Sequence, residues 1–145
     1  MNDKVISFWN YADLKKSLGD KKRFWKEDCP FCRDIQTGER VYWKWEYWSV
    51  LYNSYPYILS GDHFMAIPIR HVIYGHELTS NEWSELSRIQ EHLRETFRNV
   101  DYFSFTRESL AERSVEHYHM HFIKGDITRR AIIEMLKKQW IDTSE

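Results

Sequence analysis

The feature of this chain that most restricts its fold is a short segment in which histidine alternates with large apolar residues. From 117 to 122 the sequence reads His-Tyr-His-Met-His-Phe. Side chains of an extended strand point alternately to opposite faces, so the three imidazoles would share one face while Tyr118, Met120 and Phe122 enter a core. We therefore predict a strand over 115–123 with a row of imidazoles on one side.

The chemistry open to this row follows from the properties of imidazole. Near neutral pH an imidazole can act as a nucleophile, as a general acid or base, or as a metal ligand. Neighbouring members of the row would lie about 7 Å apart along a strand, which suits a phosphate or a metal ion held between them. The row alone leaves three interpretations open: a catalytic site, a metal site, and the polar face of a surface strand.

Length and composition indicate one ordinary domain. The chain has 145 residues, of which 42% are hydrophobic, and only five glycines and three prolines. We therefore expect a single core without a long linker. An amphipathic pattern over 3–25 predicts a peripheral helix. Residues 1–28 would form this N-terminal helical extension, and residues 29–145 the domain itself.

Charge and cysteine content restrict the partners and the compartment. The formal net charge of −1 gives no overall field for nucleic acid or for an anionic membrane, so we expect neither as a general partner, and an anion must be bound locally. The apolar segment near the N-terminus is too short for a signal sequence or a membrane span. Two cysteines are too few for a secreted disulfide framework, so we expect a cytoplasmic protein.

The remaining pattern predicts an α+β fold. A long helix is expected over 80–99, because a capping box at 79–82 precedes an apolar stripe at helical spacing. That stripe consists of Trp83, Leu86, Ile89, Leu93 and Phe97. Other expected elements are a helical turn over 33–39 closed by Gly38, strands near 40–46, 47–53, 63–68 and 101–106, and a final helix over 128–140. Together they predict a mostly antiparallel sheet backed by a long helix.

Two cysteines stand close together at Cys29 and Cys32. Their spacing allows both thiolates to bind one tetrahedral zinc ion, which would need two further ligands, typically histidines. A redox-active dithiol and a pair of unpaired thiols are the competing interpretations. The pair is therefore a candidate metal or redox site.

Several separated segments resemble one known family. The run from His117 to Ile123 matches the His-φ-His-φ-His-φ-φ signature, where φ is apolar, of the histidine triad nucleotide hydrolases and transferases. Segments 53–57, 63–71 and 77–79 resemble, in order, the ribose-binding strand, the central strand and the helix entry of that family. The resemblance extends from about 29 to 125. It is most similar to the branch with dinucleoside polyphosphate phosphorylases and galactose-1-phosphate uridylyltransferase, and it implies a histidine-triad-like fold.

The resemblance also implies roles for individual residues. His119 matches the nucleophile that forms a nucleotidyl-histidine intermediate. His121 matches the histidine that contacts the transferred phosphate or the bridging oxygen, and His63 matches another histidine of the same pocket. Ser114 corresponds to a phosphate-contacting hydroxyl, and Asn53 to the side chain that binds the ribose hydroxyls. The implied substrate is a nucleoside phosphate or a dinucleoside polyphosphate.

A structural zinc ion and a homodimer are further implications of the resemblance. In zinc-bearing members the metal is bound by a cysteine pair with a Pro-x-x-His histidine and the first histidine of the triad. Those positions are occupied here by Cys29, Cys32, His71 and His117. Family members commonly pair through the long helix and a sheet edge, so a homodimer is expected.

The chain departs from the family just before the triad. Many members have a glycine-rich stretch with Gly-Gln there, whereas residues 107–115 contain no glycine. Arg113 stands where the family has glutamine, and a guanidinium can bind a phosphate more strongly than an amide. The prediction is a nucleotide hydrolase or nucleotidyltransferase. Two alternatives are a catalytically silent nucleotide-binding or zinc-stabilised module, and a metal-dependent enzyme that uses the histidine row as ligands.

Overall fold

The fold is known from a computed structural model, which describes residues 29–54, 56–57, 63–98, 100–108, 115–125 and 128–138. The expected helix over 3–25 and two expected phosphate-binding residues, Arg113 and Ser114, lie outside these described residues. None of the described helices combines the length and the apolar character needed to span a bilayer.

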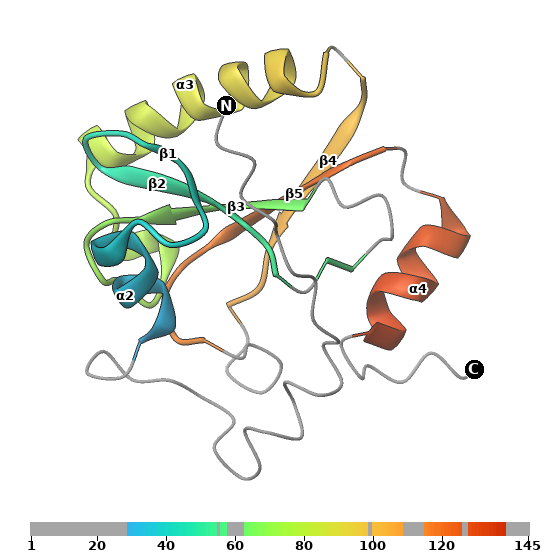
Figure 1. Ribbon diagram of the computed structural model, residues 1–145, viewed down its shortest axis with the longest axis horizontal. Helices are drawn as coiled ribbons and strands as arrows, with labels where there is room; N and C mark the ends of the chain where they lie inside the picture. The colour runs from blue at the N-terminus through green and yellow to red at the C-terminus, as the bar shows by residue number, and fades with distance from the viewer. Residues whose placement is uncertain are drawn as a thin grey trace, which may run out of the picture.

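A five-stranded antiparallel sheet forms the centre of the domain (Figure 1). Its strands are β1 (Val41–Lys44), β2 (Trp48–Tyr52), β3 (His63–Pro68), β4 (Tyr102–Thr106) and β5 (Met120–Lys124). They are arranged in the order β1-β2-β3-β5-β4, and every neighbouring pair is antiparallel. The central strand β3 is buried along its whole length, as expected for a strand covered on both faces.

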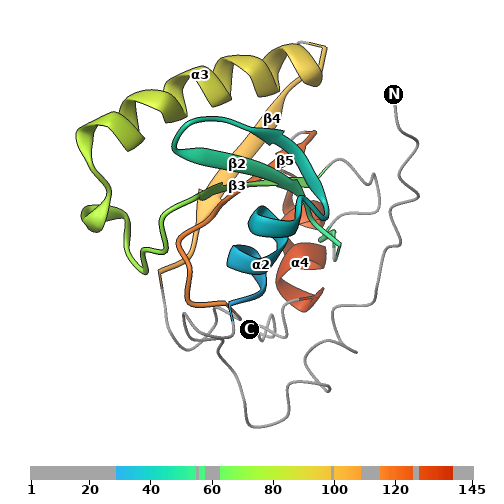
Figure 2. The same cartoon turned by 60° about the vertical axis from the view of Figure 1, so that its left-hand side comes forward.

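The long helix α3 (Ser80–Thr96) covers one face of the sheet (Figures 1 and 2). The predicted capping box is present: the Thr79 hydroxyl accepts from the Glu82 amide at 3.2 Å, and the Glu82 carboxylate accepts from the Thr79 amide at 2.7 Å. Leu86, Ile89 and Leu93 are buried as predicted. Trp83 was expected in this stripe, but 43% of it is exposed, although its ring lies 6.3 Å from that of Tyr118.

Two shorter helices lie on the other face of the sheet, α2 (Pro30–Thr37) and α4 (Arg129–Lys138) (Figure 2). Helix α2 packs on Leu51, Met65 and Ile67, whereas their strand neighbours Val50 and Ala66 belong to the core under α3. This alternation follows from the two-residue period of strands. The domain is therefore an α+β fold, as predicted, and the structure adds that helices lie on both faces of its sheet.

Helix α2 begins earlier than the sequence pattern indicated. A turn at the two cysteines followed by a helical turn over 33–39 was expected, but the helix starts at Pro30 with Cys29 as its N-cap. Proline is favourable at the first helical position, because the missing N–H would have no intrahelical partner there. Gly38 ends the helix in the left-handed region, at φ 77°, as predicted.

The predicted strand over 115–123 is wrong in its first half, since β5 begins only at Met120. Antiparallel pairing of Met120 with Ala66 would place Tyr118 opposite Pro68, and proline has no N–H to continue the ladder. The Tyr118 amide donates instead to the Val72 carbonyl at 2.7 Å. The alternation of side chains survives, because Tyr118 and Phe122 are in the core under α3 and Met120 packs against it.

Candidate active site

The ring of His119 is held by a backbone carbonyl two residues before it, not by a neighbouring strand. Its Nδ1 lies 2.6 Å from the backbone carbonyl oxygen of His117. A carbonyl oxygen only accepts, so Nδ1 carries the proton, and the neutral ring has its lone pair on Nε2. His119 is the most exposed imidazole of the row at 8%, against 0% for His117 and 2% for His121.

A chain of hydrogen bonds determines the protonation of the other two histidines. The Tyr57 amide lies 3.3 Å from Nδ1 of His63, and a backbone N–H only donates, so that nitrogen has no proton. The proton of His63 is therefore on Nε2, which lies 2.8 Å from Nδ1 of His121. It follows that His121 accepts at Nδ1 and carries its own proton on Nε2.

The Nε2 atom of His121 is a buried donor without a hydrogen-bond partner among the described residues. Burial is the main cause that lowers the pKa of His121 well below its usual value, and positive charge on His119, His63 or Arg107 would lower it further. The ring is therefore neutral at physiological pH, in agreement with the single proton inferred above. A neutral N–H donor beside the His119 ring, with ring centroids 4.9 Å apart, can stabilise negative charge on a ligand.

Aromatic side chains pack around the three rings. Phe31 of α2 meets His119 edge-on at a centroid distance of 4.9 Å. Phe105 of β4 stacks on His121 at 4.8 Å, and Tyr57 lies 4.8 Å from His63. The sequence analysis missed Phe31, Phe105 and Tyr57 as site residues. Only the cross-strand pairing of Phe105 with His121 would have indicated one of them.

Asn53 lies beside His63, as the resemblance implies. Its Nδ2 lies 3.3 Å from Nδ1 of His63, the ring nitrogen that can accept a hydrogen bond, and the Asn53 side chain is buried. The structure thus brings Asn53 together with His63, His119 and His121 on one side of the sheet.

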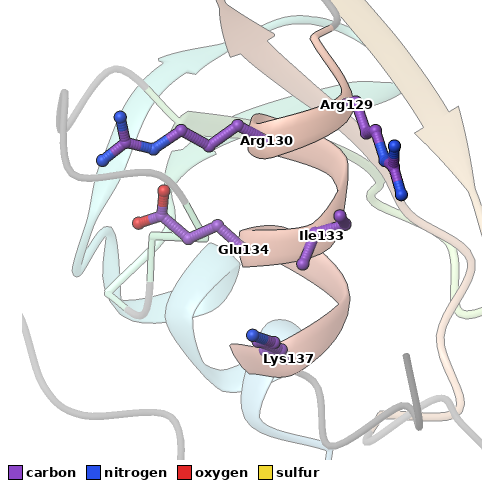
Figure 3. A pocket seen from close by; sticks show the side chains of 5 residues that line it. All are labelled: Arg129, Arg130, Ile133, Glu134 and Lys137. Atoms are coloured by element: carbon purple, nitrogen blue, oxygen red, sulfur yellow. The ribbon is translucent and has the colours of Figure 1, made fainter. Parts of the chain in front are cut away.

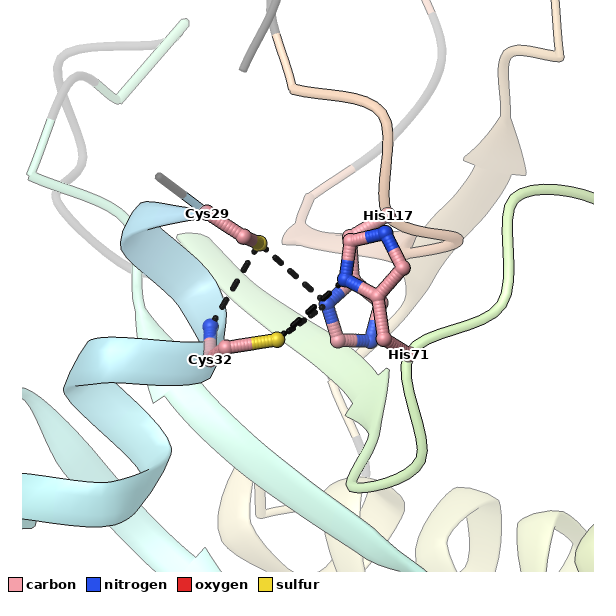
Figure 4. A group of neighbouring side chains, drawn as sticks. All are labelled: Cys29, Cys32, His71 and His117. Carbon is pink, nitrogen blue, oxygen red and sulfur yellow. Dashed lines mark hydrogen bonds between the residues drawn. The ribbon is translucent and has the colours of Figure 1, made fainter. Parts of the chain in front are cut away.

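The four expected metal ligands also come together (Figure 4). The ligand atoms of Cys29, Cys32, His71 and His117 all lie within 4.8 Å of one another. Sulfur-to-nitrogen distances are 3.2 Å from Cys32 to His71 and 3.5 Å from either cysteine to His117. A tetrahedral zinc site with ordinary bond lengths would have such distances at about 3.5 Å. The group can therefore hold a metal ion.

The environment of His117 and Cys29 fits metal binding. Nε2 of His117 lies 2.7 Å from the Pro68 carbonyl, so it carries the proton and Nδ1 presents its lone pair to the two sulfurs. Burial is the main cause of the lowered pKa of His117, which is about 3. The ring is therefore neutral near pH 7, and only a neutral imidazole can bind a metal ion. Burial raises the pKa of Cys29 to about 12, and a bound cation would reverse this effect.

Both cysteines are free thiols in the structure, with no disulfide between them. Cys29 is buried and Cys32 is half-buried. The sulfurs of both point toward the two imidazoles (Figure 4). This geometry favours metal binding over the redox interpretation.

A cavity of about 600 Å³ lies at α4, away from the residues discussed so far (Figure 3). It is lined by Arg129, Arg130, Ile133, Glu134 and Lys137. None of these residues was predicted to act in the site, and none contacts the histidine row through a described interaction.

Comparisons with known proteins show what the fold is similar to. No protein-family model matches the sequence, and no curated protein does. A hypothetical protein from Leishmania major matches with a TM-score of 0.61 and 16% identity, over 79% of this chain and 94% of that one. A HIT family hydrolase from Clostridium thermocellum matches with a TM-score of 0.57 and 21% identity, over 70% and 94%.

A hypothetical histidine triad nucleotide-binding protein from Sulfolobus tokodaii also matches, with a TM-score of 0.56 and 18% identity, over 77% of this chain and 89% of that one. At such identities the likeness concerns the fold. The chain therefore has an α+β histidine-triad-like fold.

Proposed function

We propose that this protein is a histidine triad enzyme that transfers a nucleotidyl group through His119, most similar to the branch with the Cys-x-x-Cys motif. Its substrate would be a nucleoside phosphate or a dinucleoside polyphosphate. The observation that supports this most is the hydrogen bond of 2.6 Å between Nδ1 of His119 and the His117 carbonyl. That bond leaves the Nε2 lone pair as the nucleophile.

The proposed reaction has two steps. The Nε2 lone pair of His119 attacks a phosphorus atom, an N–P bond forms, and the P–O bond to the leaving group breaks, with its electron pair going to the leaving oxygen. Water then attacks the same phosphorus, the N–P bond breaks, its electron pair returns to Nε2, and the proton of water passes to solvent or to the departed anion. An acceptor other than water would make the enzyme a transferase.

Neighbouring residues have supporting roles in this proposal. The Nε2–H of His121 donates to an oxygen of the reacting phosphate, and the hydrogen bond from His63 maintains the tautomer of His121. Asn53 would bind the ribose hydroxyls, while Ser114 and Arg113 would contact phosphate.

We further propose that Cys29, Cys32, His71 and His117 bind a structural zinc ion. The sulfur and nitrogen distances and the protonation of His117 support this ligand set. When bound, the ion would tie the start of α2 to the triad segment, because His117 also provides the carbonyl that holds His119. The ion would act on the nucleophile His119 only indirectly, by fixing the position of His117.

The metal-dependent alternative, with the whole histidine row as ligands, fits the geometry less well. His117 faces the two cysteines, whereas Nδ1 of His119 is occupied by a carbonyl and Nδ1 of His121 by His63. The row is thus divided between two environments. The four-ligand group also fits a catalytically silent, zinc-stabilised module, and turnover that depends on His119 separates the two functions.

A turnover assay tests the proposal. The protein is incubated with a panel of adenosine and guanosine polyphosphates, with and without a chelator. We expect turnover that survives brief chelation and is lost in His119→Asn, with exposed His76→Asn as the matched control variant. Activity that returns only with added metal, or that persists in His119→Asn, would contradict the proposal.

The assembly and the cell compartment belong to the same proposal. We propose a homodimer in the cytoplasm, formed by the domain from residue 29 onward and preceded by a helical extension. Light scattering at micromolar concentration should give twice the 17.8 kDa chain mass. A monomer mass would reject the dimer.

A further inference from the structure

Arg107 directly follows β4, the strand whose Phe105 ring stacks on His121. The Arg107 side chain is half-buried, and its Nη2 donates to the hydroxyl of Tyr57 at 3.3 Å. Two other nitrogens, Nε and Nη1, are shielded from solvent and have no hydrogen-bond partner in the part of the chain that the structure describes. This guanidinium is therefore anchored at one corner, and two of its nitrogens are left to donate to something else.

A half-buried cation with two shielded, unused donors favours an acceptor of opposite charge. A guanidinium has five N–H donors and no acceptor, and leaving them unpaired away from water is unfavourable. The neighbouring carboxylate of Glu108 is engaged elsewhere, because it accepts from the Gly75 amide at 2.6 Å. The described part of the chain forms no ion pair with Arg107. An anionic ligand would supply the acceptors that Nε and Nη1 of Arg107 lack.

The position of Tyr57 places this cation near the triad. The ring of Tyr57 lies 4.8 Å from that of His63 and 5.3 Å from that of His121. Burial is the main cause of the lowered pKa of His121, and the Arg107 cation adds to it. Nε and Nη1 of Arg107 and Nε2 of His121, which have no hydrogen-bond partner among the described residues, therefore lie in one region of the molecule.

We propose that Arg107 binds the phosphate groups on the leaving side of the bond that His119 attacks, next to the donor of His121. The substrates are then nucleoside polyphosphates, including dinucleoside polyphosphates, in preference to nucleoside phosphates with an uncharged leaving group. This inference rests on the proposed function and adds the class of leaving group. Its chemical reason is that a departing polyphosphate carries the electron pair of the broken P–O bond, and a cation beside it stabilises that charge.

The test compares two substrates that differ in the leaving group, diadenosine tetraphosphate and adenosine 5′-phosphoramidate. We expect Arg107→Met to lower kcat/KM for the tetraphosphate about 10- to 100-fold more than for the phosphoramidate, the size expected for charge-assisted hydrogen bonds. Arg107→Lys should restore part of the difference, because it restores the charge without the planar fork. Arg88→Met, an exposed arginine on α3, is the matched control and should change neither value.

Equal losses on both substrates, or no loss on either, would overturn the inference. If the wild-type protein turns over neither substrate, the proposed function fails, and calorimetry with ATP and AMP then decides the role of Arg107 separately. Wild-type protein should bind ATP more tightly than AMP, and Arg107→Met should reduce that ratio about 10-fold or more. An unchanged ratio in a variant with wild-type thermal unfolding would refute the anion site.

Discussion

Removal of the metal site should destabilise the domain through a predictable linkage. The perturbation is Cys29→Ala, compared with wild-type protein before and after chelation. The thiol of Cys29 is buried and lies 3.5 Å from Nδ1 of His117. The substitution therefore removes one of four ligands without adding a charge.

The size of the effect follows from binding to the folded state alone. The four ligand atoms lie within 4.8 Å of one another, and they come from the start of α2, the loop after β3 and the triad segment, so the unfolded chain has no such site. A free zinc concentration of 1,000 times Kd would then stabilise the folded state by about 4 kcal/mol. For a domain of this size, that corresponds to a rise in Tm of about 8–16 °C.

Thermal unfolding followed by circular dichroism, together with metal analysis, measures this effect. We expect about one zinc per wild-type chain and a fall in Tm of that size after chelation. Cys29→Ala should have the lower Tm at the start and should not respond to chelator. A wild-type protein that is purified without metal, and whose Tm is the same with added zinc and with chelator, would refute the reasoning.

Further predictions concern protons, packing and the helix cap. Since burial raises the pKa of Cys29 to about 12, zinc binding near pH 7 should release its proton, and calorimetry in buffers of different ionisation enthalpy would detect this; no buffer dependence would contradict it. Burial lowers the pKa of His117 in the folded state to about 3, so between about pH 3 and pH 6.5 the unfolded state binds more protons than the folded state. The free energy of unfolding of the metal-free protein should therefore fall by about 2 kcal/mol from pH 7 to pH 5. A free energy of unfolding, measured with denaturant, that does not change over this range would refute the prediction. Phe31→Ala removes the ring packed on His119 and should cost about 3–5 kcal/mol of stability, whereas Phe31→Leu should cost clearly less; equal Tm values for the two variants would contradict this packing. Thr79→Ala should cost about 1 kcal/mol by loss of the helix cap, and exposed Asn81→Ala is its control.

Sequence patterns that extend over only a few residues predicted most of the fold. The capping box at Thr79 and the left-handed stop at Gly38 depend on chemistry within a few residues, and both are confirmed. The two-residue alternation around His119 correctly assigned opposite faces to the imidazoles and to the apolar residues between them. These predictions need no knowledge of distant contacts, and for that reason they could be made from the sequence.

The errors arose where a distant residue decides the local structure. β5 starts late because Pro68, more than fifty positions away in the chain, cannot continue the ladder. The ring of His92 meets that of Trp43 at 4.0 Å, a contact between α3 and β1 that no local pattern reveals. The contacts of Phe31 and Arg107 could not be predicted for the same reason. The contact of Phe31 depends on the packing of α2 against the triad, and that of Arg107 depends on the position of the end of β4 near Tyr57.

The group of metal ligands shows both what a local sequence pattern can predict and what it cannot. The spacing of Cys29 and Cys32 indicated two ligands on its own, whereas His71 and His117 came only from the resemblance to a family. The structure brings all four together. The division of the histidine row between this group and the His119 region also came only from the resemblance, because strand alternation alone places all three imidazoles on one face.

The most direct test of the central claim is to trap the covalent intermediate. The protein is mixed briefly with diadenosine tetraphosphate, quenched in alkali, where phosphoramidate bonds to histidine persist, and analysed by peptide mass spectrometry. The account predicts an adenylyl group on His119, absent from His119→Asn and retained in His76→Asn. An adduct on another residue, or rapid turnover with no adduct on His119 at any time, would contradict it.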